Sequence, residues 1–417
     1  YILYYELTLN SIAYIEKECI LMTNCIIAQS GGPTSVINSS VVGLYNANKE
    51  LKAYNKVFAG LNGIEGILNG NIIDLTSYSD EEINKFRFTP SSGLGSCRYK
   101  MKDLDESTEE YDKLLDILKA NDIKAFFYVG GNDSMDTTAK LSRYAKETGI
   151  DITFIGIPKT IDNDLMYTDH TPGFGSAAQF IANSVLETYL DSSVYTNNGI
   201  FILETMGRDT GWLAAAGALA QMNGKSVADF IYLPERAFDI EIFLKDVTDK
   251  FKEQNQVYIV VSEGIKDKKG KFISEIQADA NDKFGHAQLG GVGNYLKKLI
   301  INAGITKRVK SLELGVLQRC AMHCSSEIDL KEAYEAGYEA LKYSLTGKCG
   351  YMVTIERTSN DPYETSYSLI EADKVANNIK YFPTDWINDN GNHIEPQALK
   401  YLLPLISPLP EFKVFNK

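Results

Sequence analysis

One pattern recurs along this chain: a short apolar stretch rich in β-branched residues, then a turn rich in Gly, Asp or Thr, then a helical segment. Five stretches begin such units: Asn24–Gln29, Asp122–Val129, Asp151–Pro158, Gly199–Met206 and Gln256–Val261. Short apolar strands that alternate with helices indicate βαβ units, and hence parallel sheets with helices on both faces. The sequence therefore predicts an α/β protein.

The turns that follow these strands are the expected place for a binding site, because ligands of open parallel sheets lie just beyond the C-terminal ends of the strands. A length of 417 residues predicts two or three domains, at about 150 residues each. Composition alone does not reveal the domain boundaries.

Charge and composition exclude several classes of partner. The net charge of −13 and the lack of a Lys/Arg-rich run argue against nucleic acid, since binding to a phosphate backbone needs a basic face. A small phosphorylated ligand is still allowed if basic residues gather locally. No apolar stretch reaches the ~18 residues of a membrane span. The expectation is a protein without a membrane partner.

The six cysteines are scattered without the spacing of a disulfide framework, which is typical of reduced thiols and predicts a cytoplasmic location. Cys320, His323 and Cys324 lie close in sequence, but no second ligand pair accompanies them, so helix packing is favoured over a metal site. Residues 1–21 lack the basic start and cleavage site of a signal peptide. We treat them as an N-terminal extension without an assigned function.

Three turns suit a phosphate group. Ser30–Ser35 (SGGPTS) has two glycines that let an anion approach the backbone, although a plain tight βα turn explains it equally well. In Thr89–Lys100, Arg98 and Lys100 can bind phosphate oxygens, with a solvated surface loop as the alternative. Tyr128–Lys140 contains GGNDS at the start of a helix, yet Asp133 places a carboxylate where an anion would bind.

The stretch Ile157–Leu165 is the most demanding, because it gathers Lys159, Thr160, Asp162 and Asp164 on one loop. A carboxylate there can accept a hydroxyl proton while the lysine neutralises a transferring phosphoryl group. A capped helix start is the structural alternative. Together with the phosphate-compatible turns, this stretch indicates phosphoryl transfer between two small phosphorylated molecules.

Two further strand ends and a late arginine add to this picture. In Thr205–Gly211, Gly207 allows a backbone contact to an anion and Arg208 can hold a phosphate or a hydroxyl. Glu235 can accept hydrogen bonds from a sugar, and Arg319 adds another cation. Taken alone, Glu235 and Arg319 fit ordinary structural roles.

In order along the chain, the motifs SGGPTSVIN, GSCRYK, GGNDS, PKTIDND, TPGFGSAA, ETMGR, LPE and LGVLQR resemble the phosphofructokinase family, and most of all its pyrophosphate-dependent branch. The resemblance implies two similar Rossmann-like domains with mainly parallel sheets, an active site between them, and a homodimer or homotetramer. The implied phosphoryl-donor domain comprises residues 22–174 and about 319–370. The implied fructose 6-phosphate domain comprises residues 175–318 and about 371–417.

Site residues follow from the same resemblance. The catalytic residues it implies are Asp162, Lys159 and Asp133, with Asp162 as the base that activates the C1 hydroxyl of fructose 6-phosphate. The residues implied to bind pyrophosphate are Gly31, Gly32, Arg98, Gly131, Asp133, Ser134 and Lys159. The residues implied to bind the sugar phosphate are Thr160, Ile161, Asp162, Met206, Gly207, Arg208, Glu235, Lys310 and Arg319.

Two positions point to the donor. Nucleotide-using relatives have glycine at the positions of Asp133 and Lys159, whereas pyrophosphate users have aspartate and lysine. A carboxylate at position 133 would repel the α-phosphate of a nucleotide. The resemblance also implies Mg²⁺, for which Asn132, in place of the usual aspartate, and Asp164 are the candidate ligands.

The expected reaction is a reversible transfer from pyrophosphate to fructose 6-phosphate, used in glycolysis and gluconeogenesis. Two enzyme alternatives are an ATP-dependent 6-phosphofructokinase and a pyrophosphate-dependent sedoheptulose 7-phosphate kinase. An alternative of another class is a non-catalytic subunit that binds sugar phosphates and regulates a partner.

Overall fold

The computed structural model describes residues 23–274 and 291–415, so the predicted extension, residues 1–21, lies outside the described residues. The chain folds into two compact units and passes between them several times. Unit 1 comprises residues up to 160, 165–173 and 330–379; unit 2 comprises residues 161–164, 174–329 and 380 onward.

Unit 1 contains a seven-stranded sheet with the strand order β13-β12-β5-β4-β1-β2-β3. Its strands are β1 (Asn24–Gln29), β2 (Val57–Gly60), β3 (Ile72–Asp74), β4 (Ile123–Gly130), β5 (Thr153–Pro158), β12 (Tyr351–Asn360) and β13 (Tyr363–Glu371). The five inner strands are parallel, and the two edge strands, β3 and β13, pair antiparallel to their neighbours.

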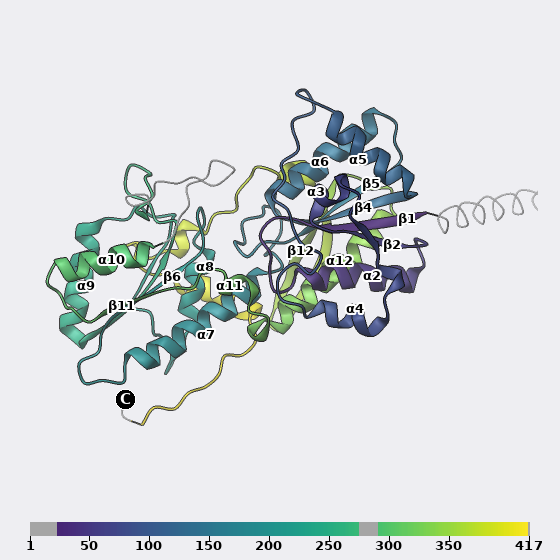
Figure 1. The fold of residues 1–417 in the computed structure, drawn as a ribbon. Helices are drawn as coiled ribbons and strands as arrows, with labels where there is room; N and C mark the ends of the chain where they lie inside the picture. Colours follow the sequence, from purple (N-terminus) through teal and green to yellow (C-terminus); the bar gives the residue numbers. More distant parts are fainter. Residues whose placement is uncertain (1–22, 275–290, 416–417) are drawn as a thin grey trace, which may run out of the picture. The chain divides into compact units, whose positions relative to one another are not determined.

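Helices cover both faces of this sheet (Figure 1). They are α2 (Ile37–Leu51), α3 (Gly63–Leu68), α4 (Asp80–Arg87), α5 (Glu109–Ala120), α6 (Asn132–Glu147), α12 (Glu327–Ser344) and α13 (Ala372–Val375). Strand β1 shows why both faces are apolar: Cys25 and Ile27 pack with α2 and α12, whereas Ile26 and Ala28 pack with α3 and α5. Alternate residues of a strand point to opposite faces, so a strand buried on both faces is continuously apolar.

Unit 2 contains a four-stranded parallel sheet with the order β11-β6-β10-β9. Its strands are β6 (Gly199–Thr205), β9 (Phe230–Tyr232), β10 (Gln256–Ser262) and β11 (Val309–Glu313), and a small antiparallel pair is formed by β7 (Gln221–Met222) and β8 (Lys225–Ser226). Its helices are α7 (Phe174–Ser192), α8 (Trp212–Ala215), α9 (Ile240–Gln254), α10 (Val292–Asn302), α11 (Leu317–Cys320) and α14 (Pro396–Leu402). Short 3₁₀ helices complete the fold: η1 (Leu75–Ser77), η2 (Ala216–Leu219), η4 (Met322–Cys324), η5 (Thr384–Trp386) and η6 (Leu403–Leu405).

Both faces of the central strand β10 are buried as well. Val257 and Ile259 pack in one core cluster with residues of α9 and α10. On the other face, the ring of Tyr258 stacks on Phe201 and lies edge-on to Tyr189 of α7. The prediction of an α/β protein with mainly parallel sheets and helices on both faces is thereby confirmed. The sequence analysis did not identify the antiparallel strand pair β12–β13.

Among the described residues, no helix has the length and apolarity that crossing a membrane requires.

Candidate active site

Two of the predicted phosphate turns, Ser30–Ser35 and Tyr128–Lys140, meet the Ile157–Leu165 stretch at one edge of the unit 1 sheet. Strands β5, β4 and β1 are neighbours and parallel, so the turns after them leave the same edge. The backbone N–H of Ser30 donates to the carbonyl of Val129 at 2.9 Å, and that of Lys159 donates to Gly130 at 3.0 Å. Sheet topology thus gathers segments that are more than 120 residues apart in sequence, as the Lys159–Gly32 separation of 127 shows.

The side chain of Lys159 crosses to the first of these turns. It is 3% exposed, and its Nζ donates to the carbonyl oxygen of Gly32 at 2.7 Å. Gly31 has φ +74°, and a Cβ at this position would lie 3.3 Å from the Lys159 Nζ. A buried ammonium group needs close polar partners, and an anion bound at this turn would lie beside a fixed positive charge.

The loop that carries Arg98 lies against the same turn. Gly31 donates its N–H to the carbonyl of Cys97 at 2.9 Å, and the hydroxyl of Ser96 donates to the carbonyl of Gly31 at 2.6 Å. Arg98 itself is exposed. The structure therefore brings the loop that carries Arg98 to the Gly31–Gly32 turn, which Lys159 also contacts.

Helix α6 begins at this edge of the sheet. Its N-cap residue is Gly131, which provides no side-chain cap, and Asp133 is the acidic residue of the first turn. Ser134 is buried and Asp133 is exposed. The N-terminus of a helix attracts an anion through its amides, but the Asp133 carboxylate already brings one negative charge there and repels further ones.

Asn132 has a clear structural contact. Its amide faces the carbonyls of Val375 and Asn378, so we assign the nitrogen to that side, where it donates at 2.9 Å and 3.0 Å and joins α6 to the end of α13. Its carbonyl oxygen is then the atom with which it can bind a cation. Within the part of the chain that the structure describes, no group of three or more His, Cys, Asp or Glu side chains is arranged to hold a metal ion.

In unit 2, the turns after β6 and β10 also lie side by side. The N–H of Glu263 donates to the carbonyl of Thr205 at 2.9 Å. Gly207 has φ +125°; its N–H donates to the Glu263 carboxylate at 3.3 Å, and its carbonyl accepts from the Ser262 hydroxyl at 2.5 Å. The turn Met206–Arg208 is therefore held directly against Glu263.

The segment 161–164 with Asp162 belongs to unit 2 and is fixed there at several points. The carbonyl of Asp162 accepts from the Thr210 hydroxyl at 3.1 Å. Asn163 is fully buried; its amide donates to the Tyr401 hydroxyl at 3.0 Å and accepts from Lys380 at 3.3 Å. The position of Asp162 thus depends on residues far along the chain, since Tyr401 follows Asn163 by 238 positions.

Glu263 shares its surroundings with Asp162 and Arg208. Burial and the negative charge of Asp162 raise the pKa of the Glu263 carboxyl to about 7, against the opposing effects of the Gly207 N–H and the Arg208 cation. The sequence analysis did not propose Glu263 as a site residue. Its position at the end of the fifth recurring strand was the available signal, because neighbouring parallel strands deliver their next residues to one edge.

The chain is similar to proteins of one known family. The family described as Phosphofructokinase matches residues 24–344. The chain belongs to the phosphofructokinase family. It is 40% identical over 386 residues to a protein of Halomonas elongata named pyrophosphate–fructose 6-phosphate 1-phosphotransferase, covering 92% of this chain and 91% of that protein.

Solved structures of phosphofructokinases resemble the fold closely. A pyrophosphate-dependent phosphofructokinase from Nitrosospira multiformis matches with a TM-score of 0.82 and 38% identity over 94% of each chain. One from Marinobacter aquaeolei matches with a TM-score of 0.82 and 39% identity, also over 94% of each chain.

Two further predicted sugar-phosphate contacts, Glu235 and Lys310, have other partners within the protein. One oxygen of Glu235 accepts from the backbone N–H groups of Gly211 at 2.8 Å and Phe382 at 2.9 Å, and burial raises the pKa of this carboxyl. Glu235 thus joins two backbone segments.

Lys310 lies within β11, three residues before the strand ends, and pairs with Asp191 at 3.2 Å on the surface. The structure does not bring it to the strand ends. Arg319 is half-buried on α11, whose Gln318 accepts from the N–H of Met206 at 3.2 Å. Arg319 therefore lies on an element that contacts the Met206–Arg208 turn.

Proposed function

We propose that the protein transfers a phosphoryl group from magnesium pyrophosphate to the C1 hydroxyl of fructose 6-phosphate, giving fructose 1,6-bisphosphate and phosphate. The reaction is reversible and serves glycolysis and gluconeogenesis. The observation that carries the donor assignment is the pair of charges at one sheet edge: the Lys159 amine at the Gly32 carbonyl, and the Asp133 carboxylate in the first turn of α6. Relatives with the same activity in their names support it.

Unit 1 supplies the proposed donor site. Gly31, Gly32, Gly131 and Ser134 offer backbone and hydroxyl groups to a diphosphate, while Arg98 and Lys159 offer positive charge. Asp133 limits the donor, because a nucleotide would add an α-phosphate to a space that already carries a carboxylate. A compact diphosphate avoids this repulsion.

Unit 2 supplies the proposed acceptor site. Asp162 takes the proton from the C1 hydroxyl as the hydroxyl attacks, which is general base catalysis. Met206, Gly207, Arg208 and Glu263 hold the sugar phosphate, and Lys159 stabilises the charge that develops on the transferring group. Asp162 follows Lys159 by three positions on one continuous loop, so base and cation are carried by the same segment.

The remaining candidates, Thr160, Ile161, Glu235, Lys310 and Arg319, are kept as proposed sugar-phosphate contacts. Thr160 and Ile161 lie on the loop between the cation and the base. Lys310 reaches a phosphate only if its ion pair with Asp191 opens, and both side chains are more than 60% exposed, which makes that opening easy.

Magnesium fits a site of this composition. Mg²⁺ commonly binds through one or two protein oxygens and the phosphate oxygens of a substrate, so no dedicated cluster of protein ligands is required. The carbonyl oxygen of Asn132 and the carboxylate of Asp164 are the proposed protein ligands. The ion would neutralise negative charge on the diphosphate.

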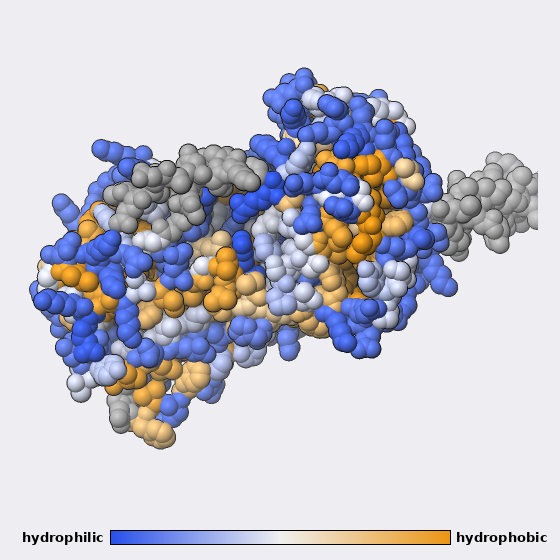
Figure 2. Space-filling view, viewed as in Figure 1, coloured by the Kyte–Doolittle hydropathy of each residue, from blue (hydrophilic) through white to orange (hydrophobic). Residues whose placement is uncertain are grey.

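A homodimer or homotetramer in the cytoplasm completes the proposal. Hydrophobic residues gather over α11 on the face drawn in Figure 2, where Val316 and Leu317 are each 58% exposed and Leu312 of β11 is 37% exposed. Exposed apolar groups of this kind mark interaction surfaces. The five described cysteines are free thiols, which supports a reducing compartment.

A coupled assay of fructose 1,6-bisphosphate formation tests the donor. We expect turnover with magnesium pyrophosphate and at most about one tenth of that rate with magnesium ATP, given the repulsion at Asp133. Turnover with ATP alone would overturn the donor assignment. Sugar-phosphate binding without turnover on either donor would favour the regulatory subunit instead.

The acceptor is tested separately. With pyrophosphate fixed, kcat/KM for fructose 6-phosphate should exceed that for sedoheptulose 7-phosphate. Discrimination by size in a pocket amounts to roughly tenfold to two hundredfold per added group. The reverse order of the two sugars would reassign the acceptor and leave the donor assignment intact.

A further inference from the structure

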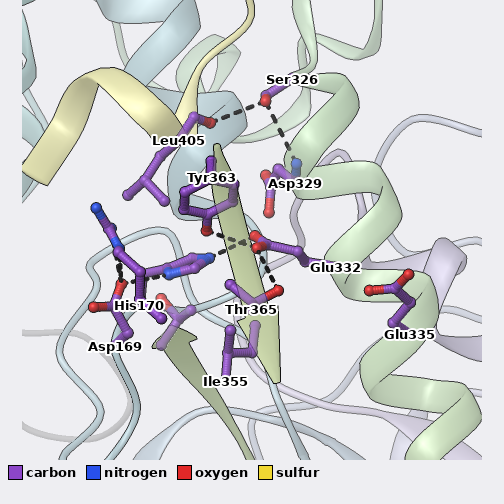
Figure 3. Close-up of polar contacts among 12 residues, drawn as sticks. Asp169, His170, Ser326, Asp329, Glu332, Glu335, Ile355, Tyr363, Thr365 and Leu405 are labelled. Carbon is purple, nitrogen blue, oxygen red and sulfur yellow. Dashed lines mark hydrogen bonds and ion pairs between the residues drawn. The ribbon is translucent and has the colours of Figure 1, made fainter. Parts of the chain in front are cut away.

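A buried histidine lies close in sequence to the proposed donor site, and the proposed mechanism does not use it. His170 belongs to the unit 1 segment Leu165–Gly173 and is 1% exposed. Figure 3 shows its ring between two carboxylates: Nδ1 lies 2.8 Å from Asp169, and Nε2 lies 2.6 Å from Glu332 of α12. Each ring nitrogen therefore has a hydrogen-bond partner within the protein.

The two carboxylates connect His170 to the unit 1 scaffold. Asp169 accepts from Arg357 of β12 at 2.8 and 3.1 Å. Glu332 accepts from the hydroxyl of Tyr363 of β13 at 2.7 Å and from Thr365 at 3.3 Å (Figure 3). Two positive and two negative groups thus form one buried network that joins the segment to a helix and to the β12–β13 pair.

The charge state of His170 agrees with this geometry. Burial alone would lower the pKa of His170, but the charge of Glu332 and the hydrogen bonds to Asp169 and Glu332 raise it to about 9. The ring is therefore protonated at neutral pH, and both nitrogens donate.

The residues immediately after His170 contact two of the proposed donor turns. The hydroxyl of Thr171 donates to the carbonyl of Thr160 at 2.8 Å, and the N–H of Thr160 donates to the carbonyl of Pro172 at 3.2 Å. Gly173, with φ +110°, lies so close to Thr34 that a Cβ would come within 2.6 Å of its methyl group. A shift of this segment would move the backbone next to Lys159 and the turn Ser30–Ser35.

A buried ion network is a costly way to fill space, since apolar residues of similar volume are often equally stabilising or better. Its distinctive property is fixed geometry, because each charged group has its partners at defined positions. Here the residues one and two positions after His170, Thr171 and Pro172, are the ones that hydrogen-bond to the backbone of Thr160.

We propose that His170 is a positioning residue for the phosphoryl donor: by joining Asp169 to Glu332 it fixes Thr171 and Pro172 against Thr160, and so places Lys159 at the Gly32 turn. This inference rests on the proposed function. His170 itself does not contact the substrate.

Four variants test the inference. His170→Ala removes both contacts, His170→Asn keeps a donor near Asp169, and His170→Gln keeps a donor near Glu332. The control is His393→Gln in unit 2, where the ring nitrogens lie 3.1 and 3.2 Å from the carbonyls of Ile394 and Ala228. Steady-state kinetics in both substrates, thermal midpoints, and calorimetric binding of pyrophosphate without sugar are measured for each.

We expect His170→Ala to lower kcat/KM for pyrophosphate by roughly tenfold to a hundredfold, the size of effect that small misplacements of catalytic groups produce. KM for fructose 6-phosphate should also rise, because Thr160 is the proposed sugar-phosphate contact that this segment touches, but it should rise less than KM for pyrophosphate. His170→Asn and His170→Gln should each recover part of the loss, and His393→Gln should change neither value. Binding of pyrophosphate should weaken in the same order as kcat/KM.

Equal losses toward both substrates, or unchanged pyrophosphate parameters in a folded His170→Ala protein, would overturn the inference and show a merely structural histidine. If His170→Ala does not fold, Glu332→Gln decides, because it keeps the volume and the Tyr363 contact while removing one charge; unchanged pyrophosphate binding in that variant would count against the inference. Failure of the proposed function is distinguishable, since the unmodified protein would then lack pyrophosphate-dependent turnover.

Discussion

In both units most of the proposed site residues lie at the C-terminal ends of parallel strands, but the charges of these residues differ. At the strand ends of unit 1, the groups brought together are a buried lysine, an exposed arginine, glycine turns and a helix N-terminus. At the strand ends of unit 2, the buried carboxyl of Glu263 lies within the electrostatic influence of two further carboxyl groups, Asp162 and Glu204, and of the Arg208 cation. The fold therefore sets where functional groups meet, and the turn residues decide what those groups attract.

This difference assigns the two substrates. A diphosphate carries several negative charges and suits the cationic edge of unit 1. A sugar presents hydroxyls, which carboxyl groups can hold or deprotonate, and suits the edge of unit 2. Burial raises the pKa of both Glu204 and Glu263 to about 7, so near neutral pH these two carboxyls are partly protonated.

Removing the proposed base, Asp162, should have the largest effect on turnover. We expect Asp162→Asn to lower kcat by roughly a hundredfold to ten-thousandfold, the usual worth of a general base, while fructose 6-phosphate still binds. Turnover is measured by the coupled assay and binding by calorimetry. Asp209→Asn is the matched control, because Asp209 lies nearby in sequence and pairs with Lys266 at 3.2 Å. Near-normal turnover of Asp162→Asn would refute the base assignment.

Neutralising the unit 1 edge should have the next largest effect. Lys159→Met keeps most of the side-chain volume and removes the charge beside Gly32. We expect kcat to fall roughly a hundredfold to a thousandfold, as when one preorganised stabilising group is deleted, and KM for fructose 6-phosphate to change little. Lys56→Met, at an ion pair with Asp74 whose lysine is 46% exposed, serves as control. A larger change in the sugar's KM than in kcat would mean that Lys159 serves unit 2.

Removing the Asp133 carboxylate should have a smaller effect, which concerns the affinity for ATP. Asp133→Gly and Asp133→Asn both delete the charge in the first turn of α6, and the asparagine keeps the volume. Because Asp133 is exposed and solvent screens it, we expect ATP to inhibit competitively against pyrophosphate only about tenfold more tightly. If the glycine variant alone gains ATP affinity, bulk rather than charge excludes the nucleotide. An unchanged inhibition constant in both variants would show that Asp133 does not select the donor.

The strand ends of the parallel sheets were predictable because their sequence signals are local. The apolar runs before Ser30, Gly131 and Lys159 predict the strands, and the turn residues after them (SGGPTS, GGNDS and KTIDND) predict the turns. Parallel strands then bring those turns to one edge. Residues such as Lys159 and Gly32 could thus be placed at one site before their contact was visible.

Residues whose role depends on distant partners were not predictable in this way. His170 is unremarkable in sequence, because its partner Glu332 lies 162 positions later and contacts it only through the packing of α12. Glu263 follows a recurring strand in the short sequence SEG, a position that marks a strand end but not a role, and its contact with Gly207 shows what it does. Lys310 shows the converse, since a motif position suggested a ligand contact and the structure places it on the surface beside Asp191.

The smallest expected effect concerns the carboxyl that gives unit 2 its pH dependence. If the protonated Glu263 holds the sugar phosphate, KM for fructose 6-phosphate should rise up to about tenfold between pH 6 and pH 8, because the pKa of Glu263 is about 7. Glu263→Gln removes this titration, so its KM should be nearly independent of pH and within about threefold of the unmodified value at pH 6.

Stability gives an independent check with a fixed sign. A carboxyl whose folded pKa is raised from 4.5 to about 7 binds its proton more tightly when folded, so it destabilises the protein as the pH rises from about 4.5 through 7. Glutamine lacks this penalty. The thermal midpoint of Glu263→Gln relative to the unmodified protein should therefore be higher at pH 8 than at pH 5. If the difference in thermal midpoint between the two proteins does not depend on pH, the pKa of Glu263 is not raised. Glu263 would then be ionised at neutral pH and would add a full negative charge to the strand ends of unit 2.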